Sequence, residues 1–137
     1  MNIAVAVDGS DNAFRAATYA IKLASHFPDA RLEVIFVADY DKAKEEHLLT
    51  QSPESITLKR EQKTHPIINL ATADNIDAHT ILLKGKPSFE IINYVNEHEV
   101  DHLVLGSRGL NVFQEMILGS VSHKVMKHVN CPVTIVK

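Results

Sequence analysis

Short, continuous apolar runs alternate along the chain with stretches in which apolar residues recur at helical spacing. Continuous runs are typical of strands that are covered on both faces of a parallel sheet, whereas strands covered on one face alternate apolar and polar residues. The runs occupy residues 3–7, 32–38, 80–84, 102–105 and 132–136. The pattern therefore predicts five buried parallel strands.

Four segments between these runs have the periodicity of amphipathic helices. Ser10 or Asp11 can cap the first, which continues to about Phe27 with alanine recurring along one side. The second covers residues 53–75, and we expect a kink or a break at Pro66, because an interior proline removes a hydrogen bond and clashes with the preceding turn.

The third and fourth helices are marked at their starts. Pro87 suits the first turn of the third, which ends near residue 98. The fourth follows Gly119, and its expected inward stripe is Val121, Val125 and Val129. Strands alternating with helices predict an α/β fold: a single doubly wound five-stranded parallel sheet with helices on both faces and right-handed crossovers.

The bulk composition narrows the functional classes. A chain of 137 residues, 45% hydrophobic and 23% charged, predicts one globular domain covering residues 1–137. A net charge of −3 provides no basic patch for nucleic acid. The early apolar run lacks a basic flank and ends at Asp8, so we expect neither a signal peptide nor a membrane span, and a cytoplasmic location. The lone Cys131 is interpreted as a packing residue.

A charged, irregular stretch at residues 40–55 interrupts the alternation after the second strand. We expect it to be a mobile excursion at the carboxyl edge of the sheet. It is also the segment that we expect to order on ligand binding and to be recognised by a protein partner.

Glycines with fixed spacing follow the fourth strand. Gly106 and Gly109 are separated by two residues, and nine residues later Gly119 and Ser120 open the last helix. Glycine lets the main chain approach an anion, and a helix N-terminus offers unpaired N–H groups with a partial positive charge. The spacing predicts a phosphate cradle. The alternative is a set of ordinary turn and cap glycines.

Asp8 ends the first strand at the same edge of the predicted sheet. In doubly wound sheets, ligands bind beyond the carboxyl ends of the strands, where the strand order reverses. If the first and fourth strands are neighbours, Asp8 faces the glycine loop and can accept hydrogen bonds from ribose hydroxyls or lie beside an adenine amino group. The alternative role of Asp8 is a helix cap.

The residues quoted so far resemble the universal stress protein family, in its nucleotide-binding branch with the Gly-x2-Gly-x9-Gly-Ser motif. The resemblance spans the whole chain. It is carried by LGSRGL at 105–110, LGSVSHKVMKHVNCPVTIVK at 118–137, VAVDGS at 5–10, VIFVAD at 34–39 and GKP at 85–87. Departures from the family pattern stand at Asn111 and Pro66.

The resemblance implies a site for ATP or another adenine nucleotide, with Mg²⁺ held through the nucleotide rather than by the protein. The implied phosphate-binding residues are Gly109, Gly119, Ser120, Val121 and Ser122. Arg108 is added because a guanidinium beside a polyphosphate is chemically apt. The implied nucleoside-binding residues are Ala6, Val7, Asp8, Val37, Leu105 and Gly106, with Val37 offering its main chain to the adenine edge.

Other chemistries have weaker support in the sequence. Eight histidines lack metal-ligand spacing, since His123 and His128 are about 140° apart around a helix. The chain has no Gly-x-Ser-x-Gly elbow, no P-loop ending in Gly-Lys-Ser/Thr and no Gly-x-Gly-x-x-Gly pattern. These absences point away from a hydrolase, a fast ATPase and a dehydrogenase.

Two functional hypotheses remain. The first is a small ATP-binding regulatory protein of the stress response, a nucleotide-dependent switch with at most slow hydrolysis and an unidentified protein partner. The second is a nucleotide-free dimeric interaction module of the same fold. Both include a homodimer through Val133, Ile135 and Val136, because an apolar strand at the edge of a sheet needs a cover. The physiological nucleotide stays open among ATP, AMP and a cyclic nucleotide.

Overall fold

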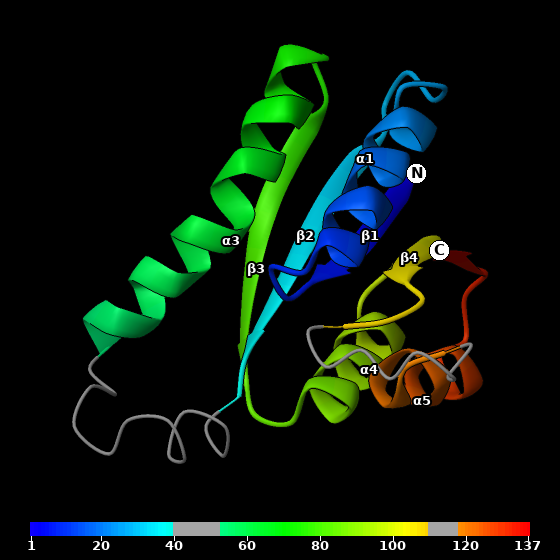
Figure 1. The fold of residues 1–137 in the computed structure, drawn as a ribbon. Coiled ribbons are helices and arrows are strands. Elements are labelled where there is room, and N and C mark those ends of the chain that lie inside the picture. Colours follow the sequence, from blue (N-terminus) through cyan, green and yellow to red (C-terminus); the bar gives the residue numbers. More distant parts are fainter. Residues whose placement is uncertain (40–52, 110–117) are drawn as a thin grey trace.

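The computed structural model describes residues 1–39, 53–109 and 118–137, and Figure 1 shows their arrangement. Their strands form one parallel sheet in the order β3-β2-β1-β4-β5. The strands are β1 (Asn2–Val7), β2 (Arg31–Ala38), β3 (Asp77–Lys84), β4 (His102–Gly106) and β5 (Val133–Val136). The predicted doubly wound parallel sheet is confirmed, and β1 and β4 are neighbours at the point where the strand order reverses.

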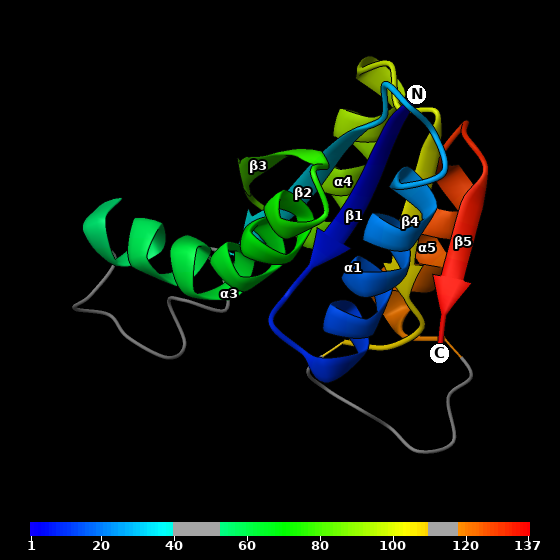
Figure 2. The ribbon, with the colours of Figure 1, turned by 90° about the horizontal axis from the view of Figure 1, so that it is seen from above.

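Helices cover both faces of the sheet, with α1 and α3 in front of it and α4 and α5 behind in Figure 2. They are α1 (Asp11–Ala24), α3 (Pro53–Ala73), α4 (Pro87–Glu97) and α5 (Ser120–His128). The sheet separates two cores because successive strand residues point to opposite faces. In β1, Ile3 and Val5 pack on the side of α1, whereas Ala4 packs on the side of α4.

Helix α1 approaches the sheet closely because its inward side is made of small residues. These are Ala13, Ala16, Ala17, Ala20 and Ala24, all buried. Ser10 is the N-cap, and its hydroxyl accepts a hydrogen bond from the N–H of Ala13 at 3.1 Å. The helix ends at Ala24 rather than near Phe27, because the chain then tightens into a turn in which the N–H of Phe27 bonds the carbonyl of Ala24.

Helix α3 continues unbroken through Pro66, so of the two expected outcomes, a kink or a break, the break is wrong. Pro66 lies on the exposed side of the helix, where a carbonyl that loses its helical partner can bond water. The helix is bent along its length in Figure 1. It ends before Asn75, whose positive φ of 59° reverses the chain so that β3 begins at Asp77 rather than at residue 80.

Helix α5 turns a different side inward from the one that its valines predict. Val121 is 38% exposed, so the expected stripe of Val121, Val125 and Val129 is wrong at its first position. Ser122 and Val125 are the buried residues, one helical turn apart. The hydroxyl of Ser122 donates to the main-chain carbonyl of Gly106 at 2.6 Å, and this bond sets the rotation of the helix.

Two sequence-based expectations fall outside the described residues. The charged excursion lies almost wholly at 40–52, and the loop around Asn111 lies at 110–117.

Candidate functional site

The turn after β1 is built by its own residues. The carboxylate of Asp8 accepts a hydrogen bond from the N–H of Ser10 through Oδ1 at 2.9 Å. Gly9 adopts a φ of +88°, which an L side chain rarely tolerates. Because Ser10 caps α1, the alternative role of Asp8 as the helix cap is wrong. One of its carboxylate oxygens shapes the turn, and the other is directed elsewhere.

That second oxygen lies against the glycine loop. A Cβ placed on Gly109 would be 2.7 Å from Oδ2 of Asp8, closer than real Cβ contacts come. The fold thus brings Asp8 and Gly109 together across the boundary between β1 and β4, as the adjacent-strand prediction requires. A side chain at residue 109 would therefore displace the carboxylate of Asp8.

The segment after β4 is fastened at both of its described ends. Ser107 donates its N–H to the carbonyl of Val136 at 2.8 Å, which continues the ladder between β4 and β5. The carbonyl of Ser107 then accepts the N–H of Gly119 at 2.7 Å. The start of α5 is therefore held next to the end of β4.

Asn12 holds the same segment from the side of α1. Its side chain is 8% exposed, and Oδ1 accepts the N–H of Arg108 at 3.0 Å while Nδ2 lies 3.5 Å from the hydroxyl of Ser107. A Cβ on Gly106 would collide with Oδ1 of Asn12, so Gly106 permits this close approach.

Asn12 is not among the site residues predicted above, although its position in the sequence pattern of α1 marks it. Asn12, Ala16 and Ala20 are spaced four residues apart and are all buried, so they share the inward row of α1. A polar residue at the first position of an apolar row, at the carboxyl edge of the sheet, indicates a side chain that bonds a neighbouring loop.

The N-terminus of α5 supplies hydrogen-bond donors to this edge. The first bond within the helix runs from the N–H of His123 to the carbonyl of Gly119 at 2.9 Å, so the N–H groups of Ser120, Val121 and Ser122 have no partner within the helix. These groups carry the positive end of the helix dipole.

Gly119, the residue before this helix, lies against the loop, and its N–H bonds the carbonyl of Ser107 at 2.7 Å. A Cβ on Gly119 would lie 3.5 Å from Cα of Arg108, 3.6 Å from the carbonyl oxygen of Ser107 and 3.7 Å from N of Gly109. These are ordinary contact distances, and φ is −66°, so a side chain could be accommodated without strain. That side chain would stand beside the helix N–H donors. Main-chain N–H groups at a helix start next to a glycine-bearing loop can bind an anion.

The other site residues that the family resemblance implied divide into two groups. Val7 and Leu105 are buried in the core, and Ala6 packs against it, so they can line a site only through their main chain and the ends of their strands. Val7, the last residue of β1, pairs with Phe36 of β2, and Val37 is the next residue of β2. At Val37, β2 has passed the end of β1 and continues beside β3. Its position at the carboxyl edge agrees with the expected location.

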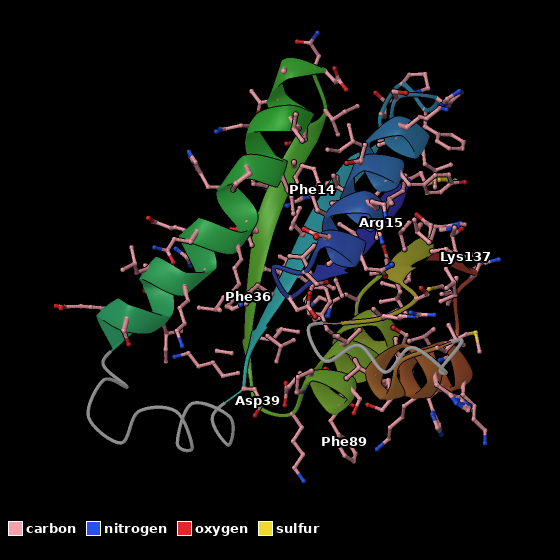
Figure 3. All side chains as sticks on the ribbon, viewed as in Figure 1. Phe14, Arg15, Phe36, Asp39, Phe89 and Lys137 are labelled. Carbon is pink, nitrogen blue, oxygen red and sulfur yellow. The ribbon has the colours of Figure 1, made fainter. Side chains whose placement is uncertain are left out.

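The side chain of Ser122 is already used. Its buried hydroxyl donates to the carbonyl of Gly106, so it fastens α5 to β4. Ser120 is exposed at the first position of the helix, and Arg108 is half-buried in the loop. Beyond the cradle, Lys124 of α5 lies 4.1 Å from the ring centroid of Phe89, the residue labelled below α4 in Figure 3.

Other chemistries find little support in residues 1–39, 53–109 and 118–137. No group of three or more His, Cys, Asp and Glu side chains there could hold a metal ion. None of the helices in those ranges is long and apolar enough to cross a membrane. Burial raises the pKa of the Cys131 thiol, which disfavours its thiolate form.

The sequence of this chain matches the model of a known protein family. The model of the Universal stress protein family covers residues 1–137. The chain belongs to the universal stress protein family. It is 34% identical to Universal stress protein YxiE of Bacillus subtilis, over 97% of this chain and 96% of that protein. It is 30% identical to Universal stress protein MJ0531 of Methanocaldococcus jannaschii, over 98% of this chain and 81% of that protein.

Solved structures of universal stress proteins have the same architecture. Universal stress protein UspA from Lactobacillus plantarum superposes with a TM-score of 0.78 at 28% identity, covering 100% of this chain and 97% of that one. The protein MJ0577 superposes with a TM-score of 0.88 at 25% identity, covering 99% of this chain and 94% of that one.

Proposed function

We propose that this universal stress protein binds an adenine nucleotide at the carboxyl edge of the sheet, between β1 and β4. The observation that carries the proposal is the N-terminus of α5, whose first N–H groups have no partner within the helix and which Gly119 holds against residues 107–109. Such donors favour a phosphate because its charge complements the helix dipole.

The proposed phosphate site combines main-chain and side-chain donors. The N–H groups of Ser120, Val121 and Ser122, at the positive end of the helix dipole, face the phosphates. Gly109 and Gly119 leave room for the phosphates. Arg108 adds a guanidinium. Ser122 contributes only its main chain, since its hydroxyl is engaged. The nucleoside lies toward Asp8, with Ala6, Val7, Val37, Leu105 and Gly106 around it.

Structures that share this fold support the choice of an adenine nucleotide. A universal stress protein was solved in complex with cAMP, an Arabidopsis thaliana member with AMP bound, and the Archaeoglobus fulgidus protein in complex with dAMP. Their identities to this chain are 24%, 22% and 21%, a likeness of fold, so the proposal rests on the cradle in this chain. We take ATP with Mg²⁺ held through its phosphates as the ligand.

The proposed output is binding rather than chemistry. Fast phosphoryl transfer has two requirements. One is a group that orients the attacking water, and the other is a charge placed on the leaving phosphate. In the part of the chain that the structure describes, the proposed phosphate site offers main-chain N–H groups, an exposed hydroxyl and the guanidinium of Arg108, and Asp8 stands at the nucleoside end. We therefore propose a nucleotide-dependent switch with turnover roughly a thousandfold or more below the typical enzyme value of about 10 per second. Steady-state hydrolysis near that typical value would overturn this part of the proposal.

The direct test of nucleotide binding is to denature the purified protein and analyse the supernatant by absorbance and chromatography. We expect released adenine nucleotide, or, for protein stripped of it, a saturable calorimetric titration with ATP and AMP. Protein that releases none and shows no binding would instead support the nucleotide-free interaction module.

The edge of the sheet supports a homodimer. β5 pairs only with β4 among the strands of the sheet, and its Val133, Ile135 and Val136 are half-buried. Two copies can pair these edges antiparallel about a twofold axis. We expect a dimer mass by sedimentation at tens of micromolar protein, and weaker association in Val133→Lys with its circular dichroism preserved. A monomer mass for the wild type contradicts this assembly.

A further inference from the structure

Lys63, on α3, reaches the carboxyl edge of β1 from the opposite side to the glycine loop. Its ammonium group donates to the main-chain carbonyl of Asp8 at 2.8 Å and lies 5.8 Å from the ring centroid of Phe36. Phe36 is labelled between α3 and β2 in Figure 3. The half-buried stem crosses the turn, since a Cβ on Gly9 would lie 3.1 Å from both Cδ and Cε of Lys63.

This contact is separate from the apolar contacts that hold α3. Ile67 and Ala71 are 2% and 0% exposed and fasten the second half of the helix to the sheet. Lys63 lies one turn nearer the start of α3, where the helix diverges from the sheet in Figure 1. Its charged end is placed on a carbonyl that follows the last residue of β1, at the entrance to the proposed site.

Asp8 is thus held on two sides. Lys63 bonds its main-chain carbonyl, while its carboxylate bonds the N–H of Ser10 and lies against Gly109. The carboxylate is bonded to the N–H of Ser10 within the same turn, so a shift of the main chain at residues 8–10 carries the carboxylate relative to Gly109. The lysine holds this main chain at the carbonyl of Asp8 and is therefore in a position to set the place of the carboxylate.

We infer that Lys63 is a positioning residue of the nucleotide site, which acts through Asp8 and joins α3 to the nucleoside end of the ligand. The inference rests on the proposed function. A residue that positions the nucleoside contact affects adenosine and AMP equally, because both present the same base and ribose. A lysine that touched the phosphate directly would affect AMP much more than adenosine.

The test is calorimetric titration of four proteins with adenosine and with AMP: the wild type, Lys63→Met, Lys63→Arg and Lys59→Met. Lys59 is a matched control because it is an exposed lysine one turn earlier on α3. We expect Lys63→Met to lose about threefold in affinity for both ligands, less than the loss expected from removing the Asp8 carboxylate, because the lysine acts through Asp8. Lys63→Arg, which keeps a donor, should recover most of the loss, and Lys59→Met should match the wild type.

The outcomes separate the two proposals. A wild type that binds neither ligand removes the proposed function, and the role of Lys63 with it. A wild type that binds while folded Lys63→Met binds equally well removes the role of Lys63 alone. A loss for AMP far larger than for adenosine also overturns positioning, in favour of a direct phosphate contact. If Lys63→Met does not fold, Lys63→Gln takes its place with the same criteria.

Discussion

Two glycine-bearing connections meet at the carboxyl edge of the sheet, and they are built in opposite ways. The turn after β1 is stabilised from within by the bonds from Asp8 to Ser10 and from Ser10 to Ala13. The described ends of the connection after β4 bond to β5, to Asn12 on α1 and to the start of α5. The first is mainly a local motif, to which Lys63 of α3 adds one long-range bond at the carbonyl of Asp8, and the second exists only in the assembled fold.

The difference predicts where a substitution acts. A change within the turn after β1 should mainly cost stability through the start of α1, because its bonds are satisfied locally. A change in the contacts around the segment after β4 should mainly cost ligand binding, because these contacts place the cradle donors relative to one another. The predictions below test this separation.

The largest effect is expected at Gly119. A Cβ there meets only ordinary contact distances, and valine adds two methyl groups beyond it, beside the loop and the N–H donors of α5. We expect Gly119→Val to lose on the order of a hundredfold or more in AMP affinity by calorimetry, the scale of several lost cradle contacts. Gly119→Ala should lose less, with both melting temperatures near that of the wild type. Unchanged affinity in folded Gly119→Val would refute the cradle.

Asn12 and Ser10 are a matched pair of positions for substitution. Ser10 belongs to the turn after β1, and Asn12 bonds the segment after β4. Asn12→Ala leaves the N–H of Arg108 without its acceptor, so we expect a loss of roughly 1–3 kcal/mol in unfolding free energy and about tenfold in AMP affinity. Ser10→Ala removes the cap of α1 and should cost about 1 kcal/mol with little change in affinity. Denaturant titration and calorimetry measure both. Equal affinity losses in the two variants would abolish the distinction between the connections.

The carboxylate of Asp8 bonds Ser10 in the turn after β1 and lies against Gly109 after β4. Its variants therefore separate a role in the turn from a role in ligand binding. Asp8→Ala should weaken AMP binding about fivefold, less than the cradle variants, because it removes one nucleoside contact. Asp8→Asn keeps a side-chain oxygen for the N–H of Ser10 and should therefore preserve the melting temperature. If Asp8→Ala binds as tightly as the wild type, Asp8 acts only in the turn.

Tyr94 and Glu33 provide a control away from the edge, on the face covered by α4. Burial, the charge of Glu33 and the 3.1 Å bond that Tyr94 donates to it raise the pKa of Tyr94 to about 12. Because the folded state holds this proton more tightly than the unfolded chain, stability should fall as the pH rises from about 10 to about 12. Tyr94→Phe should show a shallower decline in chemical denaturation, with AMP affinity at neutral pH unchanged. An identical decline in both proteins would exclude Tyr94 as its source.

Much of the fold could be predicted because its signals lie within single segments. Apolar runs predict the strands, and Ser10 at the start of an alanine-rich helix predicts its cap. The structure contradicts a break at Pro66 and an inward Val121, and both concern how a helix sits against its surroundings. Whether a proline breaks a helix, and which side of a helix faces inward, depend on neighbours that the local pattern does not contain.

The sequence by itself determined the order of strands and helices, the turn after β1 and the glycine spacing, because each depends on residues close together in the chain. The tertiary structure alone decided that Asn12 clamps Ser107, 95 residues away, that Ser122 fastens α5 to Gly106, and that Lys63 reaches Asp8 across 55 residues. Such contacts have no sequence spacing of their own, because they form only when the sheet brings distant ends to one edge.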